Sequence, residues 1–176
     1  MKKELAILGG GCFWCTEAVY NKVKGVISVV SGYAGGKRPH PNYEMICTGV
    51  SGYAEVVEIA YDAQIISFEE ILEIFWEIHD PTTLNAQGAD RGTQYRSVIF
   101  YQSEEQKKSA QESIKAKQKD LRNVIVTELS PAPTFYPAEA YHQNYYALNP
   151  NQGYCSMVIA PKIQKFMMKF PENLKS

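Results

Sequence analysis

The chain has 176 residues, of which 45% are hydrophobic and 21% are charged, and its formal net charge is −1. This length is enough for one domain with a full core, and the balanced charge gives no reason to expect nucleic acid or a membrane surface as a partner. No apolar run approaches the roughly 18 residues of a membrane span. The apolar run at 5–8 follows Glu4 and is too short for a secretory leader, so we expect a cytoplasmic protein.

The N-terminal part of the chain predicts three strands and one helix. The apolar run at 5–8 is typical of a buried strand, and three glycines then permit a tight turn. From residue 13 apolar side chains recur at three- and four-residue steps, as far as Val23, which predicts a helix. Strands are expected at 26–30 and 54–61, and the glycine-, proline- and tyrosine-rich residues 32–52 between them are expected to form a loop.

Two capping-box patterns predict the next helices, one from Ser67 to Glu70 and one from Ser103 to Gln106. The second helix is rich in lysine and is expected to end near Asp120. Further elements are expected along the rest of the chain: a polar loop at 87–95, strands at 97–101 and 124–129, and short helices near 138–146 and 163–169.

The resulting order is β-α-β-β-α-β-α-β, followed by a segment with many prolines and aromatic residues. Strands interleaved with helices, with one direct strand-to-strand step, predict an α+β fold, a two-layer ferredoxin-like sandwich. We expect a single domain over 1–176, with an α/β core at 1–129 and a long irregular C-terminal arm at 130–176. The tyrosines and Phe135 of the arm argue against disorder, so the arm should pack on the core and bring its cysteine near residue 12.

Cys12 follows the glycines, at the point where the first strand turns into the first helix. Unpaired backbone N–H groups and the positive end of the helix dipole favour a thiolate there, and cysteines in such positions can have a strongly lowered pKa. The glycines also leave open space in front of the sulfur. These features make Cys12 the candidate nucleophile, and the alternative is a buried thiol with no chemical task.

Four cysteines stand at positions 12, 15, 47 and 155. A structural disulfide framework is not expected in a cytoplasmic protein of this size. The open interpretations are redox catalysis, metal binding and buried thiols without a task. Cys12 and Cys15 form a Cys-x-x-Cys pair, a spacing at which the start of a helix can close a disulfide.

The segment Gly11-Cys12-Phe13-Trp14, opening a helix, resembles the signature of the type A peptide methionine sulfoxide reductases. Other segments that resemble this family follow in order, so the resemblance extends from about residue 5 to about residue 155. They are residues 31–36 with 41–43, residues 52–57, residues 79–81 with 87–97, and residues 142–143 with 149–150 and 153–155.

This resemblance implies a reductase for methionine sulfoxide, free and in proteins, that is selective for the S epimer and has no bound cofactor. It also implies thioredoxin as the electron donor, and we expect a monomer. In such a reaction a thiolate attacks the sulfoxide sulfur, and the cysteine becomes a sulfenic acid that a second thiol converts to a disulfide. The site therefore needs a proton donor for the oxygen, an apolar seat for the S-methyl group and a resolving thiol.

Glu55 is the candidate proton donor. Strand alternation puts its side chain on the same face as Val57 and Ile59, where burial would raise the pKa of a carboxyl and keep it protonated. Alternation alone is equally consistent with an exposed glutamate at the end of the strand. The glutamate of the family lies in the matching Gly-x-Ala-Glu segment, and this resemblance decides for the proton donor.

The remaining roles follow from the resemblance. Phe13 and Trp14 would seat the methyl group, although such an aromatic pair is ordinarily part of a core. Tyr43 and Tyr95 would donate hydroxyl hydrogen bonds to the sulfoxide oxygen. Asp90 would help to order the site, and its alternative is a carboxylate that caps a loop.

The resolving thiol has two candidates. Cys155, in the Gly-Tyr-Cys segment, resembles the recycling position of the family and is favoured as the first resolver. Cys15 departs from the commonest family pattern and is the rival, and the two could act in relay. Cys47 is interpreted as a spare buried thiol.

Two other functions compete with this hypothesis. A thioredoxin-like disulfide exchanger also has a strand, a Cys-x-x-Cys and a helix, but the intervening residues here are Phe-Trp and no β-α unit comes earlier. The four cysteines could in principle hold zinc, but only one close pair exists. The histidines do not form a ladder of metal ligands, so no metal is expected; they stand at 40, 79 and 142.

Overall fold

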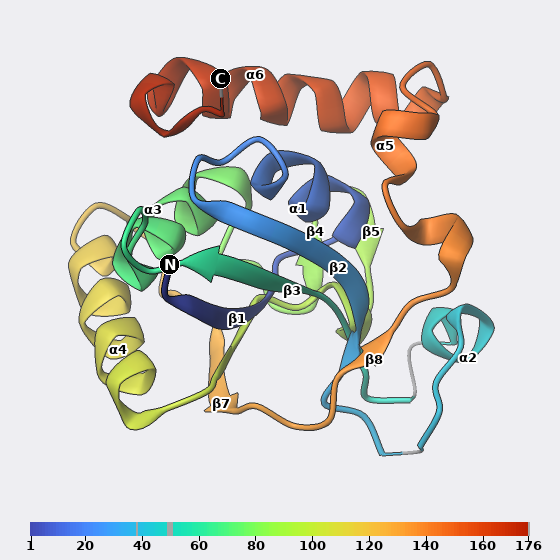
Figure 1. The fold of residues 1–176 in the computed structure, drawn as a ribbon. Helices are drawn as coiled ribbons and strands as arrows, with labels where there is room; N and C mark the ends of the chain where they lie inside the picture. Colours follow the sequence, from blue (N-terminus) through green and yellow to red (C-terminus); the bar gives the residue numbers. More distant parts are fainter. Residues whose placement is uncertain (38, 49–50, 176) are drawn as a thin grey trace.

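The computed structural model describes residues 1–37, 39–48 and 51–175. Over these residues its centre is a six-stranded mixed sheet with the order β7-β6-β1-β3-β2-β8 (Figure 1). The strands are β1 (Lys3–Gly9), β2 (Val26–Ala34), β3 (Ala54–Asp62), β6 (Val98–Tyr101), β7 (Glu128–Pro131) and β8 (Tyr136–Pro137). Pairing is antiparallel except between β6 and β7, which are parallel. The sheet and its helices confirm the predicted α+β class.

Two strands, β2 and β7, differ from their predicted bounds by four residues at one end, and the others by two residues or fewer. β2 continues to Ala34, so the expected loop was wrong at its start: Gly32 pairs with both Val56 and Pro137. A Cβ at Gly32 would clash with the ring of Phe135, which explains why glycine stands inside this strand. β7 begins only at Glu128, because the chain before it is bonded elsewhere. The N–H of Val126 donates to the carbonyl of Pro81, outside the sheet, at 2.8 Å.

Three predicted helices are present: α1 (Phe13–Tyr20), α3 (Phe68–Ile78) and α4 (Glu104–Gln118). The complete capping box of α3 is formed between Ser67 and Glu70. In α4 only half of the box forms, because the amide oxygen of Gln106 accepts the N–H of Gln102 rather than that of the capping serine. α1 ends three residues before Val23, the last residue of the apolar pattern.

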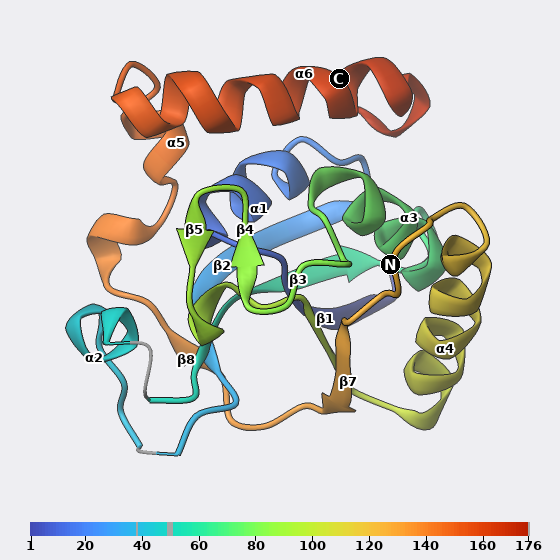
Figure 2. The ribbon, with the colours of Figure 1, turned by 180° about the vertical axis from the view of Figure 1, so that it is seen from behind.

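The C-terminal arm is more regular than expected. It contains a 3₁₀ turn (Ala140–His142), the short helix α5 (Tyr145–Leu148) and a turn of π-helix (Cys155–Ile159) that continues into α6 (Ala160–Lys169). α6 lies across the outside of α1 in both views (Figures 1 and 2). α6 begins at Ala160, before the predicted start at residue 163. Pro161 suits the first turn of a helix, and Ile163 is buried.

The loop regions contain short elements beside the site. A two-stranded hairpin, β4 (Ala86–Gln87) with β5 (Asp90–Arg91), and the 3₁₀ turn Thr93–Tyr95 interrupt the predicted polar loop. Figure 2 shows this hairpin beside α1. The short helix α2 (Tyr43–Cys47) interrupts the loop between β2 and β3.

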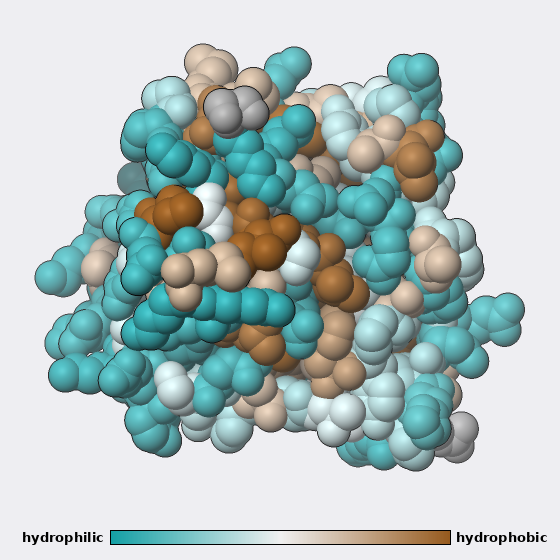
Figure 3. All heavy atoms as spheres, viewed as in Figure 1, coloured by the Kyte–Doolittle hydropathy of each residue, from teal (hydrophilic) through white to brown (hydrophobic). Residues whose placement is uncertain are grey.

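Two clusters of buried side chains hold the sheet. The larger packs α1, α3 and α6 together, and the smaller joins residues of β1, β3 and β6 to Phe135 of the arm. On the face seen in Figure 1, apolar side chains gather across the middle and polar ones surround them (Figure 3). Among the described residues, no helix combines the length and the apolar character needed to cross a membrane.

Candidate active site

The turn between β1 and α1 holds Cys12 at the start of the helix, as predicted. Cys12 is the N-cap residue, with φ −62° and ψ 128°, and its carbonyl accepts the N–H of Cys15 at 3.1 Å. The backbone before it passes close to other groups. A Cβ at Gly10 would lie 2.9 Å from the ring of His79. Gly11 has a backbone φ of +95°, which residues other than glycine rarely adopt.

A pocket of about 140 Å³ opens in front of Cys12. All seven residues predicted for catalysis and substrate binding contribute to its lining: Cys12, Phe13, Trp14, Tyr43, Glu55, Asp90 and Tyr95. The eighth lining residue, Tyr154, belongs to the Gly-Tyr-Cys segment, to which sequence reasoning gave no role beyond its cysteine. The pocket therefore joins residues from α1, β3, α2, the β4–β5 hairpin and the C-terminal arm.

Glu55 is buried, with only 2% of its surface exposed, and one carboxylate oxygen accepts the N–H of Phe13 at 3.2 Å. Burial raises the pKa of Glu55 to about 8, and the charges of Asp90 and Cys15 add to this, while the hydrogen bond from Phe13 opposes it. The carboxyl is therefore mainly protonated at neutral pH. A protonated carboxyl beside a sulfur can donate a proton to an oxygen bound in the pocket.

The two predicted tyrosines are hydroxyl donors at neutral pH. Burial raises the pKa of both Tyr43 and Tyr95 above its ordinary value, and the negative charge of Glu55, when that group is ionised, acts in the same direction. Tyr43 is held through its backbone, because its N–H donates to a carboxylate oxygen of Glu139 at 3.0 Å.

The aromatic wall of the pocket is fixed by the C-terminal arm. The ring of Trp14 stacks on Tyr145, with centroids 3.8 Å apart and planes at 6°, and its Nε1–H donates to Nδ1 of His142 at 3.1 Å. Phe13 is buried against Tyr33 and His142. Phe13 is thus part of the core, and it also lines the pocket together with Trp14.

The ionisation of the cysteines differs from the sequence-based expectation of a low pKa at Cys12. A hydrogen bond from its thiol to the sulfur of Cys15, together with burial and the charge of Glu55, raises the pKa of Cys12. The hydrogen bond from the backbone of Trp14 at the helix start lowers it, as expected, but is outweighed. The same thiol bond, with the charge of Lys162, lowers the pKa of Cys15 to about 7. The bond between the two sulfurs thus favours the thiol form of Cys12 and the thiolate form of Cys15.

Cys15 and Cys155 are buried, and Cys12 is partly buried. Cys155 is fully buried, and burial and then the charge of Cys15 raise its pKa. The expected burial of Cys47 was wrong: this thiol is exposed, because α2 is short and buries only Ile46. The arm thus brings Cys155 to the pair at the helix start, and the fourth cysteine stays outside it.

Tyr154 links the arm to the β4–β5 hairpin. Its hydroxyl donates to a carboxylate oxygen of Asp90 at 2.7 Å and lies 3.8 Å from the sulfur of Cys15. Its ring meets the ring of Trp14 edge-on at 6.0 Å. Asp90 is therefore not a free carboxylate, and it anchors the residue directly before Cys155.

The three histidines lie in separate places. His79 is buried beneath the glycine turn, where its ring bonds to the carbonyl of Phe75 and to the hydroxyl of Ser97. His142 bonds to Trp14, and His40 packs against Tyr136. Within residues 1–37, 39–48 and 51–175, no group of three or more His, Cys, Asp or Glu side chains is arranged to hold a metal ion.

A partly buried cysteine and a buried one, three residues apart and beside a mainly protonated carboxyl and two tyrosine hydroxyls, form the site of a thiol-dependent oxidoreductase. The sequence model of the peptide methionine sulfoxide reductase family matches residues 4–174. The chain belongs to this family, and it is an enzyme that reduces methionine sulfoxide.

Relatives and solved structures agree with this. The peptide methionine sulfoxide reductases MsrA of Saccharolobus solfataricus and Nautilia profundicola are each 58% identical to the chain. These matches cover 98% and 97% of this chain and 97% and 98% of the relatives, in that order. Methionine sulfoxide reductase A of Corynebacterium diphtheriae has a TM-score of 0.82 and 36% identity, covering 88% of this chain and 78% of that one.

Mxr1 of Saccharomyces cerevisiae has been solved in several forms. The reduced form matches with a TM-score of 0.81 and 37% identity, covering 88% of this chain and 90% of that one. Mxr1 in complex with Trx2 matches with a TM-score of 0.57 and 28% identity, covering 82% of this chain and 85% of that one.

Proposed function

We propose that the chain reduces the S epimer of methionine sulfoxide, free and within proteins, with Cys12 as the nucleophile and Glu55 as the proton donor. The observation that supports this most strongly is the pocket of about 140 Å³ that both residues line. The proposal extends to cell location: the enzyme works in the cytoplasm, where its four free thiols stay reduced.

In the proposed complex, Phe13 and Trp14 receive the S-methyl group, and their aromatic surface favours a methyl over water. The sulfoxide oxygen accepts hydrogen bonds from the hydroxyls of Tyr43 and Tyr95 and from the carboxyl of Glu55. The raised pKa of each of these three groups supports this arrangement, because each keeps its proton at neutral pH.

The reductive step moves two electrons from sulfur to sulfur. The thiolate of Cys15 takes the proton of Cys12 through their hydrogen bond, and the sulfur of Cys12 attacks the sulfoxide sulfur. Glu55 gives its proton to the oxygen, which leaves the substrate and remains on Cys12 as a sulfenic acid. The products are methionine, the sulfenic acid, a neutral Cys15 and an ionised Glu55, so that charge and atoms balance.

We propose Cys15 as the first resolving thiol and Cys155 as the second, although the sequence favours Cys155 for the first step. The hydrogen bond between Cys12 and Cys15 supports this order. The thiol of Cys15 attacks Cys12, releasing the sulfenic oxygen as water, and Cys155 then exchanges into the disulfide. Asp90 would assist by holding Tyr154, the neighbour of Cys155.

Thioredoxin is the proposed electron donor, and no bound cofactor takes part. A crystal structure of the yeast relative Mxr1 in complex with Trx2 supports a reductant of this kind. An outside dithiol would reduce the final disulfide by exchange and release the three buried cysteines as thiols.

We further propose that the fold is the ferredoxin-like two-layer sandwich, in a single, monomeric domain over 1–176 with a C-terminal arm. The antiparallel order β6-β1-β3-β2 supports the fold class. Contacts of α6 with α1 and α3 support a single unit, since the arm packs on the core.

The test of the proposed substrate uses separated S and R epimers of a blocked methionine sulfoxide, with thioredoxin, thioredoxin reductase and NADPH supplied. We expect NADPH consumption with the S epimer and none above background with the R epimer. Equal turnover of both epimers would contradict the proposed selectivity, and turnover of neither would contradict the reductase.

A further inference from the structure

A second, larger cavity begins at the same cysteine. It measures about 660 Å³, within the range of ligand-binding clefts, and it shares Cys12, Asp90 and Tyr154 with the small pocket. The small pocket has room for one side chain at most. When the methionine sulfoxide is part of a polypeptide, the flanking main chain must therefore leave the small pocket over these shared residues. These residues also line the start of the larger cleft.

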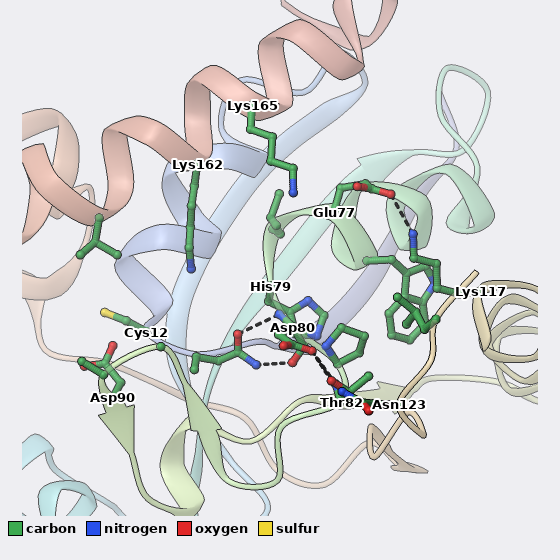
Figure 4. Close-up of a pocket in the computed structure, with 18 of the residues that line it drawn as sticks. Cys12, Glu77, His79, Asp80, Thr82, Asp90, Lys117, Asn123, Lys162 and Lys165 are labelled. Carbon is green, nitrogen blue, oxygen red and sulfur yellow. Dashed lines mark hydrogen bonds and ion pairs between the residues drawn. The ribbon is translucent and has the colours of Figure 1, made fainter. Parts of the chain in front are cut away.

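Three regions of the fold form the walls of this cleft. One wall is the β4–β5 hairpin, another is the end of α3 with the loop after α4, and the third is α6. Figure 4 shows Lys162 and Lys165 extending from α6 into the cleft, with Cys12 at one end. Val158 and Trp76 add apolar surface. The walls thus offer both apolar contacts and charge to an extended chain.

The carboxylates of the cleft are already engaged. Glu77 pairs with Lys117 at 2.9 Å and with Lys169 at 2.7 Å. Asp80 accepts hydrogen bonds from the N–H and the hydroxyl of Thr82, and Asp90 accepts the hydroxyl of Tyr154. Glu77 is therefore neutralised by two lysines, whereas Asp80 and Asp90 are bonded to neutral donors and keep their negative charge.

Three cations of the cleft stand apart from these pairs. Within the part of the chain that the structure describes, no ion pair joins Arg122, Lys162 or Lys165 to a carboxylate. Lys162 is half-buried, and its charge reaches two groups beside the turn, since it lowers the pKa of Cys15 and that of His79. Among the described lining residues four cations, these three and Lys117, face three carboxylates, so the cleft carries a surplus of one positive charge, and Lys162 lies toward the mouth of the small pocket.

We propose that this cleft binds the polypeptide flanking an oxidised methionine, and that Lys162, Lys165 and Arg122 favour substrates with aspartate or glutamate near the sulfoxide. The proposal rests on methionine sulfoxide reduction at Cys12. An exposed pair of opposite charges changes affinity by about two- to fivefold, so two acidic residues placed in the cleft should raise kcat/KM by roughly tenfold.

The test compares capped peptides with a central methionine sulfoxide flanked by aspartates, asparagines or lysines. In single turnover of the reduced enzyme, we expect the aspartate peptide to react with a higher kcat/KM than the asparagine peptide, and the lysine peptide with a lower one. The ratio should fall toward one as salt is added, because exposed charges are screened. A ratio of one at low salt would overturn the proposal.

Charge reversal locates the effect. Lys165→Glu combined with Arg122→Glu should lower the aspartate-to-asparagine ratio by about fivefold or more. A smaller folded fraction would lower both rates by the same factor and cancel in this ratio, which therefore reports only the folded variant. Lys108→Glu, on an exposed position of α4 outside the cleft, makes the same kind of charge change and should leave the ratio unchanged. Equal ratios in the double variant and this control would overturn the proposal.

Two further outcomes separate this proposal from others. If the double variant alters only the thioredoxin-supported turnover, and not the peptide ratio in single turnover, the cleft belongs to the reductant and the proposal is wrong. A blocked single methionine sulfoxide, which has no flanking residues, reports on the reductase itself. Its failure to react in the wild-type enzyme would contradict the proposed chemistry rather than the role of the cleft.

Discussion

The turn that carries Cys12 and the C-terminal arm that encloses it are held by different kinds of contact. The turn continues from β1, which is paired on both sides, and glycines allow it to pass against the His79 ring. The arm is held near its two ends by backbone pairing, of β8 with β2 and of Leu174 with Val23, and between them by individual side chains. Gln143 bonds to both backbone groups of Ser31, and Glu17 accepts the N–H of Asn144.

This difference suggests a division of tasks. In the proposed mechanism Cys12 and Glu55 keep one geometry during the chemistry, and they lie at the helix start and on the sheet. The proposed mechanism also requires Cys155 to move so that a disulfide can pass outward, and this residue lies on the arm. Changes in the first region should therefore remove the chemistry, and changes in the second should weaken it by smaller factors.

Cys12→Ser should have the largest effect. Loss of the attacking sulfur should lower the rate of methionine formation by about 10⁴-fold or more, since no other group can act in place of the nucleophile. The measurement is methionine released in single turnover. Cys47→Ser is the matched control, because that thiol is exposed, and it should retain full activity. A rate within tenfold of the wild type for Cys12→Ser would move the nucleophile elsewhere.

Glu55→Gln should come next, with a loss of about 10²- to 10³-fold, the usual worth of a general acid. The amide oxygen can still accept the N–H of Phe13, so binding should change little. In the wild type, single-turnover rates should rise as pH approaches 7, where Cys15 ionises, and fall above about 8, where Glu55 loses its proton. The variant should lack the alkaline decline; if it keeps that decline, another group is the acid.

Glu17→Gln tests the contact between Glu17 and the arm, and the quantity measured is the free energy of unfolding. Burial raises the pKa of Glu17 from 4.5 to about 7, so the protonated form favours the folded state and its stabilisation is lost as pH rises through that window. The free energy of unfolding of the wild type relative to the variant should therefore decrease by roughly 1–2 kcal/mol between those pH values, a figure reduced for partial hydration. Urea unfolding at a series of pH values measures this, and a constant difference would exclude the linkage.

Tyr154→Phe should have the smallest effect of these variants. It removes the hydrogen bond to Asp90 but keeps the ring against Trp14, so about 1 kcal/mol, or roughly fivefold in single-turnover rate, should be lost. Asp90→Ala, which removes the acceptor, should give a similar loss, and the double variant should be no worse than either single change. Additive losses would mean that the two side chains act independently.

The sequence predicted the turn and its surroundings well, because they depend on local patterns. A strand, three glycines and a helical period are enough to put Cys12 at an N-cap, whereas alternation along β3 left the burial of Glu55 open and the resemblance to the family decided it. The resemblance to the family then selected Tyr43 and Tyr95 from 12 tyrosines, and both line the pocket.

Features that depend on distant contacts were not predicted. The bond from Tyr154 to Asp90 joins residues 64 positions apart, and it requires the arm to pass beside the β4–β5 hairpin. The raised pKa of Cys12 depends on the burial of the site and on the rotamer that brings its thiol to Cys15. Neither burial nor rotamer can be inferred from a four-residue motif.

The central claim is that Cys12 attacks the sulfoxide and Cys15 resolves it before Cys155 takes part. The most direct measurement mixes the reduced enzyme with one equivalent of a methionine sulfoxide peptide, quenches with acid at successive times and maps disulfides by mass spectrometry. We predict one methionine per chain, a Cys12–Cys15 disulfide at early times and a Cys15–Cys155 disulfide later. A Cys12–Cys155 disulfide appearing first would contradict the proposed order, and methionine formed without loss of the Cys12 thiol would contradict the nucleophile.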